Sequence, residues 1–490
     1  MNAGGTREPE IRMTTAPALQ AETEHRWRDL LREGRAPLLA LIILGVWLVA
    51  ADALVTTTIL PSVGASLSGY EYFGWTASAF LTGTVVAGAC AGWLSERIGL
   101  RMAMVAAGVV LGLGCALSAL APDMAIFIAG RVLQGIAGGW VLGLVYIAMA
   151  TGFPSPQLPR LFALTNSVWG VATVLGPLLG GLFADLGSWR GVFWLFAGQA
   201  ALFAVATLWL IPVRAGERTS QRVPATPLAL LTVAIAGISA AGVIESGALA
   251  AALLAGGVAL LGFAIRIDMR SDYGLLPSQI REAGTPLRAG YLVYFMTNAA
   301  ATGFSLYGPT LLRTTLGING LTAGYIVASE AVGWTVLAIV VSGAGERWQR
   351  RWLVIGPAAI LAGVTMQAFV TASGSIPLVL VSGLLLGGGF GVSYGFLGRR
   401  VLTMFSEEET ARGSGAIAAV RGAGAAVGAA VASIGANAAG FAALDMGNAR
   451  WVALAAFGAS VPFALWGLIA AIRIARSDGK APAREALASA

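Results

Sequence analysis

Long apolar runs separated by short polar segments dominate this sequence. The runs are about 18 to 25 residues long, which lets a helix cross the ~30 Å of hydrocarbon in a bilayer. Only 11% of the 490 residues are charged, whereas soluble domains have about a quarter. Because each backbone amide in a bilayer must pair within its own segment, the runs are expected to be helices. The sequence therefore predicts an all-α polytopic membrane protein.

The apolar windows predict fourteen spans, and the basic residues indicate how these spans are oriented. Cytoplasmic loops carry an excess of lysine and arginine. With the N-terminus inside, the inner segments hold 26 of the 31 such residues, and the outer loops hold only Arg190, Arg313 and Arg450. Both termini are therefore predicted to be cytoplasmic. The expected spans are 38–62, 74–95, 102–121, 123–150, 160–186, 189–213, 227–245, 248–267, 287–313, 320–344, 352–372, 376–402, 411–441 and 450–474.

Composition also argues against several classes of function. The net charge of +7 does not indicate a nucleic-acid partner, because the arginines act as topology signals in the inner loops. Cys90 and Cys115 lie in apolar runs and are interpreted as buried thiols, and the one histidine, His25, lies in the N-terminal tail. No metal site or other cofactor is expected. The loops are too short to hold a catalytic segment, so an enzyme is not expected either.

A motif repeated 250 residues apart indicates an internal duplication. GWLSERIGLR (92–101) follows the second span, and GERWQRR (345–351) follows the tenth. Two homologous helical halves are typical of transporters whose substrate site lies near the midplane of the bilayer. The predicted organisation is an N-terminal tail at 1–37, a six-helix bundle at 38–213, linkers with two inserted helices at 214–286, a second six-helix bundle at 287–474 and a C-terminal tail at 475–490.

The repeated motif is interpreted as a cytoplasmic gate. Gly92 allows helices to pack closely, and Gly99 allows a sharp turn. The carboxylate of Glu96 is expected to pair with Arg97 or Arg101, or to sit at the positive N-terminus of a neighbouring helix. The alternative is a solvated charge that serves only topology. The second copy adds Glu346, Arg347 and Arg351.

Four further motifs have the order and depth seen in one transporter family. They are ADALVTTTILP (51–61), AGRVLQGIAGG (129–139), GVATVLGPLLGG (170–181) and a Trp-Arg-x-x-Phe pattern at 189–193. With GWLSERIGLR, they resemble motifs of the major facilitator superfamily over essentially the whole chain. Together with fourteen spans, they are similar to its drug:proton antiporter branch.

The resemblance implies a major facilitator fold: two six-helix bundles with two extra helices between them, in the inner membrane of a bacterium. It also implies a monomer. From the residues, Pro177 lacks the amide that would bond the carbonyl of Thr173, so a helix bend is expected there. By resemblance, exporters use this bend to seal one side of the cavity. The residues of this helix-5 antiporter motif are Gly170, Gly176, Pro177, Gly180 and Gly181.

Charges that remain at membrane depth are candidates for function, because burying one costs about 2.5–3.5 kcal/mol or more. Asp52 is interpreted as a proton-coupling site, with a structural hydrogen-bond acceptor as the alternative. Glu330 is a second coupling candidate, with a carboxylate that contacts a cationic substrate as its competitor. Arg131 is expected beside the cavity and, by resemblance, assists proton transfer. Arg421 is interpreted as reaching the nearby cytoplasmic end by snorkelling.

Aromatic and amide side chains near the expected cavity predict an amphipathic, partly aromatic substrate rather than a sugar. The function predicted is a proton-coupled secondary transporter, an antiporter that exports drug-like small molecules, with protons and membrane lipids as its other partners. The alternative is an uptake permease for a metabolite or vitamin such as riboflavin. The candidate substrate-binding residues are Gln134, Asn166, Trp169, Tyr291, Tyr294, Asn298 and Trp334.

Overall fold

A computed structural model describes most of the chain. The described residues are 30–31, 34–68, 73–185, 188–212, 225–244, 246–271, 274–281, 284–318, 320–406 and 408–477. His25, most of the predicted N-terminal tail, most of the C-terminal tail and the start of the linker at 213–224 lie outside these residues.

The described residues form helices joined by short connections. Eleven helical segments among them are long and apolar enough to cross a membrane, so a multi-pass helical membrane protein is confirmed, whereas the count of fourteen spans stays a prediction. The helices are α1 (Ala36–Leu67), α2 (Phe73–Ala119), α3 (Met124–Gly152), α4 (Leu158–Asp185), α5 (Trp189–Leu210), α6 (Ala225–Ala241), α7 (Gly247–Asp268), α8 (Pro286–Leu316), α9 (Gly320–Val327), α10 (Ser329–Val341), α11 (Glu346–Val370), α12 (Ile376–Leu402), α13 (Thr410–Ala438), α14 (Ala449–Gly458) and α15 (Val461–Arg476), with short 3₁₀ turns at Ser155–Gln157, Ser278–Arg281 and Phe441–Ala443.

The helix α2 turns sharply at one residue. Gly99 has φ 81° and ψ 151°, a conformation outside the helical region that glycine adopts without steric cost. The residues on either side of Gly99 correspond to the predicted spans 74–95 and 102–121. The turn that was expected at Gly99 is therefore present.

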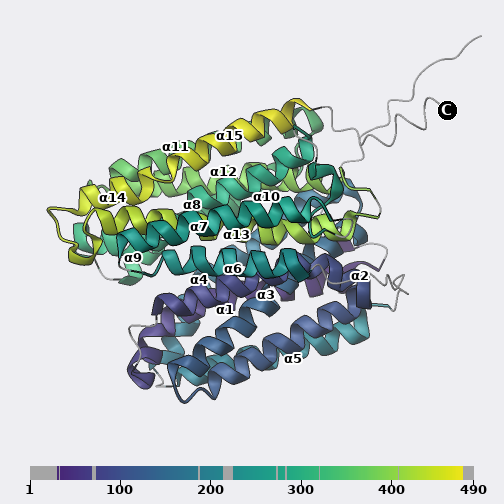
Figure 1. The fold of residues 1–490 in the computed structure, drawn as a ribbon, viewed down its shortest axis with the longest axis horizontal. Coiled ribbons are helices and arrows are strands. Elements are labelled where there is room, and N and C mark those ends of the chain that lie inside the picture. The colour runs from purple at the N-terminus through teal and green to yellow at the C-terminus, as the bar shows by residue number, and fades with distance from the viewer. Residues whose placement is uncertain are drawn as a thin grey trace, which may run out of the picture.

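The helices form two groups that lie against each other (Figure 1). Helices α1 to α5 make up one group, and α8 to α15 make up the other. The inserted helix α6 contacts both groups: Ser78 and Thr82 of α2 donate hydrogen bonds to Ser239, at 3.4 and 3.3 Å, while Ser433 of α13 donates to the carbonyl of Gly242 just after α6, at 2.8 Å. Helix α6 thus lies across the junction of the two groups, and α7 packs against α6 and α13.

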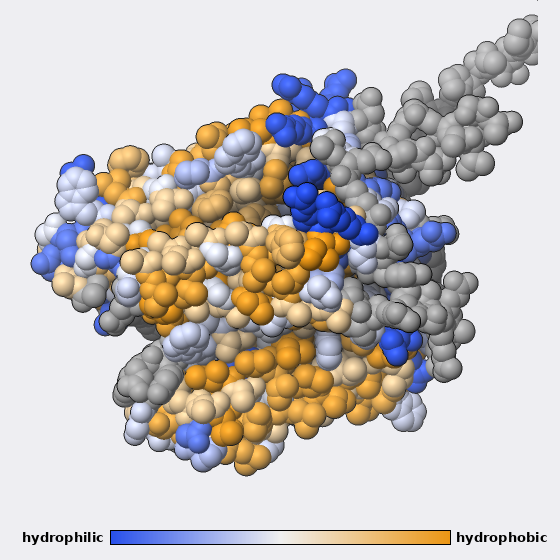
Figure 2. Space-filling view, viewed as in Figure 1, coloured by the Kyte–Doolittle hydropathy of each residue, from blue (hydrophilic) through white to orange (hydrophobic). Residues whose placement is uncertain are grey.

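Apolar side chains cover much of the outer surface. Figure 2 shows apolar residues over most of the visible face, while polar residues gather toward the ends of the helices. Large apolar side chains such as Trp209 and Val340 are 83% and 70% exposed. An exposed apolar surface of this extent is what a bilayer would cover.

Backbone packing through glycine recurs in the two groups at equivalent places. In the first group, a Cβ at Gly135 or Gly139 of α3 would overlap the carbonyl oxygen of Phe80 or Thr84 of α2. In the second group, the same overlaps would occur between Gly387 of α12 and Glu330 of α10, and between Gly391 of α12 and Trp334 of α10. Since Phe80 and Glu330, like Glu96 and Glu346, are 250 residues apart, these contacts support the duplication predicted from sequence.

We expect Gly139→Ala to destabilise the first group. The added methyl would meet the Thr84 carbonyl and the backbone nitrogen of Gly88, so α2 and α3 must separate at a cost of roughly 1–3 kcal/mol. Gly198→Ala is the matched control, because no atom lies within 4 Å of a Cβ at that position in α5. Thermal unfolding of the purified protein in detergent measures both effects. Equal melting temperatures for the two variants would contradict the packing described here.

Candidate functional site

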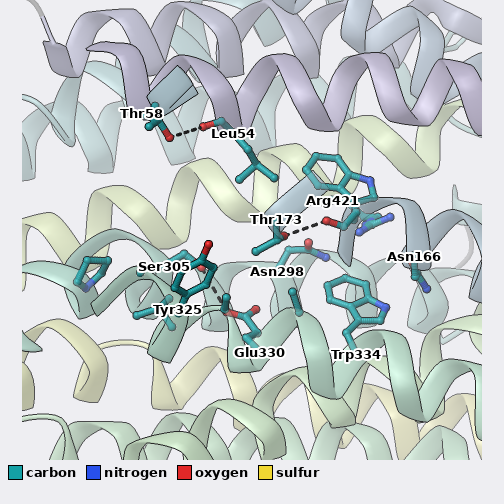
Figure 3. A pocket seen from close by; sticks show the side chains of 17 residues that line it. Leu54, Thr58, Asn166, Thr173, Asn298, Ser305, Tyr325, Glu330, Trp334 and Arg421 are labelled. Carbon is teal, nitrogen blue, oxygen red and sulfur yellow. Dashed lines mark hydrogen bonds between the residues drawn. The ribbon is translucent and has the colours of Figure 1, made fainter. Parts of the chain in front are cut away.

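A cavity of about 840 Å³ lies between the two helix groups. Its walls come from α1 and α4 of the first group and from α8, α9, α10 and α13 of the second. It extends from the middle of these helices, at Asn166 and Arg421, toward the helix ends near Gly181 and Pro309. We call that side the Asp123 end, because α3 begins there, and the other side the Glu96 end. Figure 3 shows the side chains that line the cavity.

Four of the predicted substrate-binding residues line this cavity. Asn166 and Trp169 come from α4, Asn298 comes from α8, and Trp334 comes from α10. The amide nitrogen of Asn298 donates to the hydroxyl of Tyr394, at 2.8 Å, which fixes that side chain at the wall. The cavity wall therefore combines amide groups with indole rings.

The other three predicted substrate-binding residues are not among the described residues that line the cavity. Gln134 is fully buried and donates to Ser118 at 2.8 Å and to the carbonyl of Gly114 at 3.1 Å. Tyr291 is buried and donates to the carbonyl of Gly413, and Tyr294 packs edge-on against Tyr394. These helices are apolar on all sides, so no hydrophobic period in the sequence indicates which face meets the cavity.

Glu330 lies at the cavity wall in the first turn of α10. Its Oε2 accepts a hydrogen bond from Ser305 of α8 at 3.3 Å, as Figure 3 shows. No basic side chain among the described residues forms an ion pair with it. Its backbone is held directly against Gly387 of α12, so its place on the wall is fixed by close helix packing.

Asp52 forms a buried ion pair with Arg131. The distance from Arg131 Nη1 to Asp52 Oδ2 is 2.8 Å, and the side chains are 3% and 1% exposed. The guanidinium also donates to Gln134 and lies 4.4 Å from the centre of the Phe80 ring. The second carboxylate oxygen of Asp52, Oδ1, has no hydrogen-bond partner among the described residues.

This ion pair does not line the cavity; it lies behind the cavity wall. Leu54 and Thr58 of α1 line the cavity, whereas Asp52 on the same helix points toward Arg131 of α3. Positions two apart on a helix point to different sides, so α1 presents the acid to α3 and other residues to the cavity. Arg131 was expected to lie beside the cavity, but helix α1 separates Arg131 from the cavity. By the same helix packing, Gly383 is the counterpart of Arg131 in the second group.

Arg421 lines the cavity, so its interpretation as a snorkelling residue is wrong. It lies near the middle of α13 and is half-buried. Its Nη1 donates to the hydroxyl of Tyr146 on α3, across the junction of the two groups. Its guanidinium carbon lies 5.3 Å from the centre of the Tyr394 ring and 5.9 Å from that of Trp334. The sequence signal for this site was an arginine inside a span.

The predicted gate residues meet α13 at the Glu96 end. Glu96 lies 4.0 Å from Arg412, in the first turn of α13, and a Cβ at Gly92 would lie 2.6 Å from the Cα of Arg412. We call Gly92, Glu96 and Arg412 the Glu96 latch. The observed partner of Glu96 is therefore the side chain of Arg412, at the start of a neighbouring helix, and neither Arg97 nor Arg101. Arg97 instead lies over the ring of Trp93, and Arg101 donates to the carbonyl of Leu208 at 2.5 Å.

The second copy of the motif makes different contacts. Glu346 and Arg347 are exposed at the start of α11, and Arg351 lies 4.9 Å from the ring centre of Trp348. The contact across the groups comes instead from Arg399 of α12. Its Nη1 donates to Gln349 at 2.8 Å, and its Nε donates to Ser155 of the first group at 3.3 Å.

The glycines of the helix-5 motif lie where α4 packs against other cavity helices. A Cβ at Gly170 would overlap the hydroxyl of Thr335 on α10, in the other group. Gly176 packs against Leu54 and Gly180 against Thr58, both on α1. Gly181 lines the cavity. The side chain of Pro177 lies outside the described residues, so the predicted bend stays a prediction.

The model of the Major Facilitator Superfamily matches residues 42–292 of this chain, which is half of its length. The chain belongs to the Major Facilitator Superfamily. This major facilitator protein is 31% identical over 413 residues to probable multidrug-efflux transporter MT1670 of Mycobacterium tuberculosis (strain CDC 1551 / Oshkosh), a match that covers 80% of the chain and 85% of the relative. It is 20% identical to multidrug efflux pump SdrM of Staphylococcus aureus (strain N315), with 75% and 81% covered.

Solved structures of major facilitator proteins share the fold. The proton:xylose symporter XylE superposes with a TM-score of 0.63 at 16% identity, covering 89% of this chain and 94% of that one. The human organic anion transporter MFSD10 gives a TM-score of 0.65, also at 16% identity, covering 89% and 99%. The major facilitator architecture predicted from sequence is thus confirmed as a fold.

We expect the Asp52–Arg131 pair to show strong coupling in a double-mutant cycle. Arg131→Gln leaves a buried carboxylate without a counter-charge, which should lower the free energy of unfolding by roughly 3–5 kcal/mol. Asp52→Asn leaves the buried guanidinium of Arg131 without a counter-charge and should lower the free energy of unfolding by a similar amount. The double variant should recover most of this loss. Thermal unfolding in detergent reports all three, with Arg347→Gln, an exposed arginine, as the control. Additive losses would show that the pair does not stabilise the protein.

Proposed function

We propose that this protein is a proton-coupled antiporter that exports amphipathic, partly aromatic compounds by alternating access. The two efflux transporters to which it is similar support this substrate class. The proposed orientation in the membrane follows from fourteen spans with both termini in the cytoplasm and with bundles at 38–213 and 287–474. The Glu96 end is then cytoplasmic, and the cavity opens outward.

The observation that carries this proposal is a cavity between two duplicated helix groups that is closed on one side. At the Glu96 end, Gly92 of α2 packs on the backbone of Arg412, and Gly395 of α12 packs on that of Pro159 of α4. A tilt of the groups about the cavity would open these contacts and close the Asp123 end. This is the rocking motion expected for inverted or repeated helical bundles.

The Asp52–Arg131 pair is the proposed proton site. A proton on the unpaired Oδ1 would neutralise Asp52 and weaken its attraction to Arg131. Because α1 carries Asp52 on one side and Leu54 and Thr58 on the cavity side, a change in the ion pair would reach the cavity wall through a single helix. Gly176 and Gly180 of α4 pack on this part of α1 and would move with it.

Glu330 is the proposed second coupling acid. It faces the cavity without a basic partner among the described residues, so it can hold either a proton or the cationic group of a substrate. Because a proton and a cationic substrate compete for the one carboxylate of Glu330, binding of one releases the other, which is the exchange that an antiporter performs. The two roles that the sequence left open for Glu330 are combined in this proposal.

The test is transport of the cationic dye rhodamine 123 into proteoliposomes with an acidic interior. An antiporter will accumulate dye while protons leave, and the internal pH indicator pyranine follows the protons. We expect Asp52→Asn and Glu330→Gln to reduce both signals to the level of protein-free vesicles. Glu408→Gln, an exposed acid at the Glu96 end, is the control. Dye uptake driven by the opposite gradient, or proton movement unchanged in both variants, would contradict the proposal.

We expect Glu96→Gln to slow transport about two- to fivefold without reducing the amount of protein in the membrane. The variant loses a partly exposed ion pair, which contributes about 1 kcal/mol or less to the closed state of the Glu96 latch. The initial rate of dye uptake per amount of protein measures this effect. Arg97→Gln is the control, because Arg97 lies over Trp93 in its own helix. Normal rates in Glu96→Gln would leave the latch without a role in transport.

A further inference from the structure

Two side chains of opposite charge line the central cavity without pairing. Glu330 and Arg421 both belong to the cavity wall. Among the described residues, neither forms an ion pair with the other or with any other charged side chain. In contrast, the buried Asp52 and Arg131 neutralise each other at 2.8 Å. Among the described residues, the cavity wall thus carries an acid and an arginine that have no oppositely charged partner.

The contacts of Arg421 provide no negative charge. Its guanidinium donates to the hydroxyl of Tyr146 and lies over the rings of Tyr394 and Trp334, while its Nε has no hydrogen-bond partner in the described part of the chain. Aromatic faces attract a cation but do not neutralise it. A guanidinium carries five N–H donors in a planar fork that matches a carboxylate. Arg421 thus retains the capacity to bind an anionic group.

Trp334 lies near both charges on the cavity wall, as Figure 3 shows. It follows Glu330 by four residues on α10, which places the two side chains on one face about 6 Å apart along the helix axis. The guanidinium carbon of Arg421 is 5.9 Å from the centre of the Trp334 ring. The indole itself is fixed by stacking on Phe390, with ring centres 4.4 Å apart and planes at 11°. A flat ring in the cavity beside Trp334 would therefore have both an acid and an arginine on the surrounding wall.

We propose that the cavity selects amphoteric aromatic compounds, with an anionic group bound by Arg421, a cationic group bound by Glu330 and the aromatic body against Trp334. This inference rests on the proposed function, because it takes the cavity to be the substrate site. A ligand with only a cationic group leaves Arg421 unpaired beside it, and a ligand with only an anionic group does the same to Glu330. A ligand that carries both charges pairs each of them in a site of low dielectric.

Three dyes with one ring skeleton separate these cases. Rhodamine 110 carries a cationic three-ring system and a free carboxylate, rhodamine 123 is its methyl ester and is only cationic, and fluorescein is anionic. Fluorescence anisotropy with the full-length protein in detergent gives the affinity for each dye. We expect rhodamine 110 to bind at least about tenfold tighter than either of the others, as the pairing of one more charged group implies.

Variants assign each charge to its residue. In Arg421→Gln, rhodamine 110 should bind about tenfold more weakly, while rhodamine 123 binds as well as before or better. In Glu330→Gln, rhodamine 110 should weaken, while fluorescein is unchanged or improved. Tyr146→Phe is the matched control, because it removes the hydroxyl partner of Arg421 but keeps the charge, so the preference for rhodamine 110 should remain. Arg421→Lys, which keeps the charge without the fork, should retain part of the preference.

The inference is overturned if rhodamine 123 binds as tightly as rhodamine 110, if none of the dyes binds, or if Arg421→Gln weakens both rhodamines equally. The last result would show that Arg421 serves only to join the helix groups through Tyr146. Failure of the proposed function looks different: the predicted order of affinities would hold, but a pH gradient would move no dye in proteoliposomes. Transport of rhodamine 123 without any preference for rhodamine 110 would overturn the inference alone.

Discussion

The ion pair between Asp52 and Arg131 is the interaction on which the rest of this site depends. Neither charge would be tolerated alone at this depth, because removing one partner of a buried pair leaves the other without compensation. The pair joins α1 to α3 inside the first helix group and keeps both charges out of the cavity. The cavity face of α1 is thereby left to Leu54 and Thr58, and the charges that a substrate can meet come from the second group.

The proposed motion between the groups requires each group to stay intact while the contacts between them change. Within the groups, glycines bring helix backbones into direct contact, as at Gly135 with Phe80 and at Gly387 with Glu330, and contacts of that kind have little freedom to slide. Between the groups at the Glu96 end, the contacts include a 4.0 Å ion pair and the 3.3 Å hydrogen bond from Arg399 to Ser155. Polar contacts of this strength can break and re-form, as the proposed tilt of the groups requires.

The sequence predicted the fold, the duplication and the charged candidates, but not which residues meet. Asp52, Glu330 and Arg131 were found because a charge inside an apolar run is conspicuous. The partner of Glu96 was missed because Arg412 lies more than 300 residues away, and no local pattern joins two such positions. Gln134, Tyr291 and Tyr294 were assigned to the cavity because helices that are apolar all round give no sign of their inner face. The same limit explains the misplacement of Arg421, since position within a span does not tell whether a side chain faces a cavity or reaches for water.

The duplication makes the difference between the two groups informative. Equivalent glycine contacts place Phe80 and Glu330 at matching positions. In the first group, the ring of Phe80 covers Arg131, whose charge is already met by Asp52. In the second group, the matching position carries an acid that faces the cavity, and Arg421 lies near the ring of Trp334 on the same wall. One copy thus encloses a neutral pair, whereas the other leaves both signs of charge accessible. The proposed mechanism requires this difference between the groups. Protons are exchanged at the enclosed Asp52–Arg131 pair, and substrate is exchanged at Glu330 and Arg421, which have no charged partner among the described residues of the cavity.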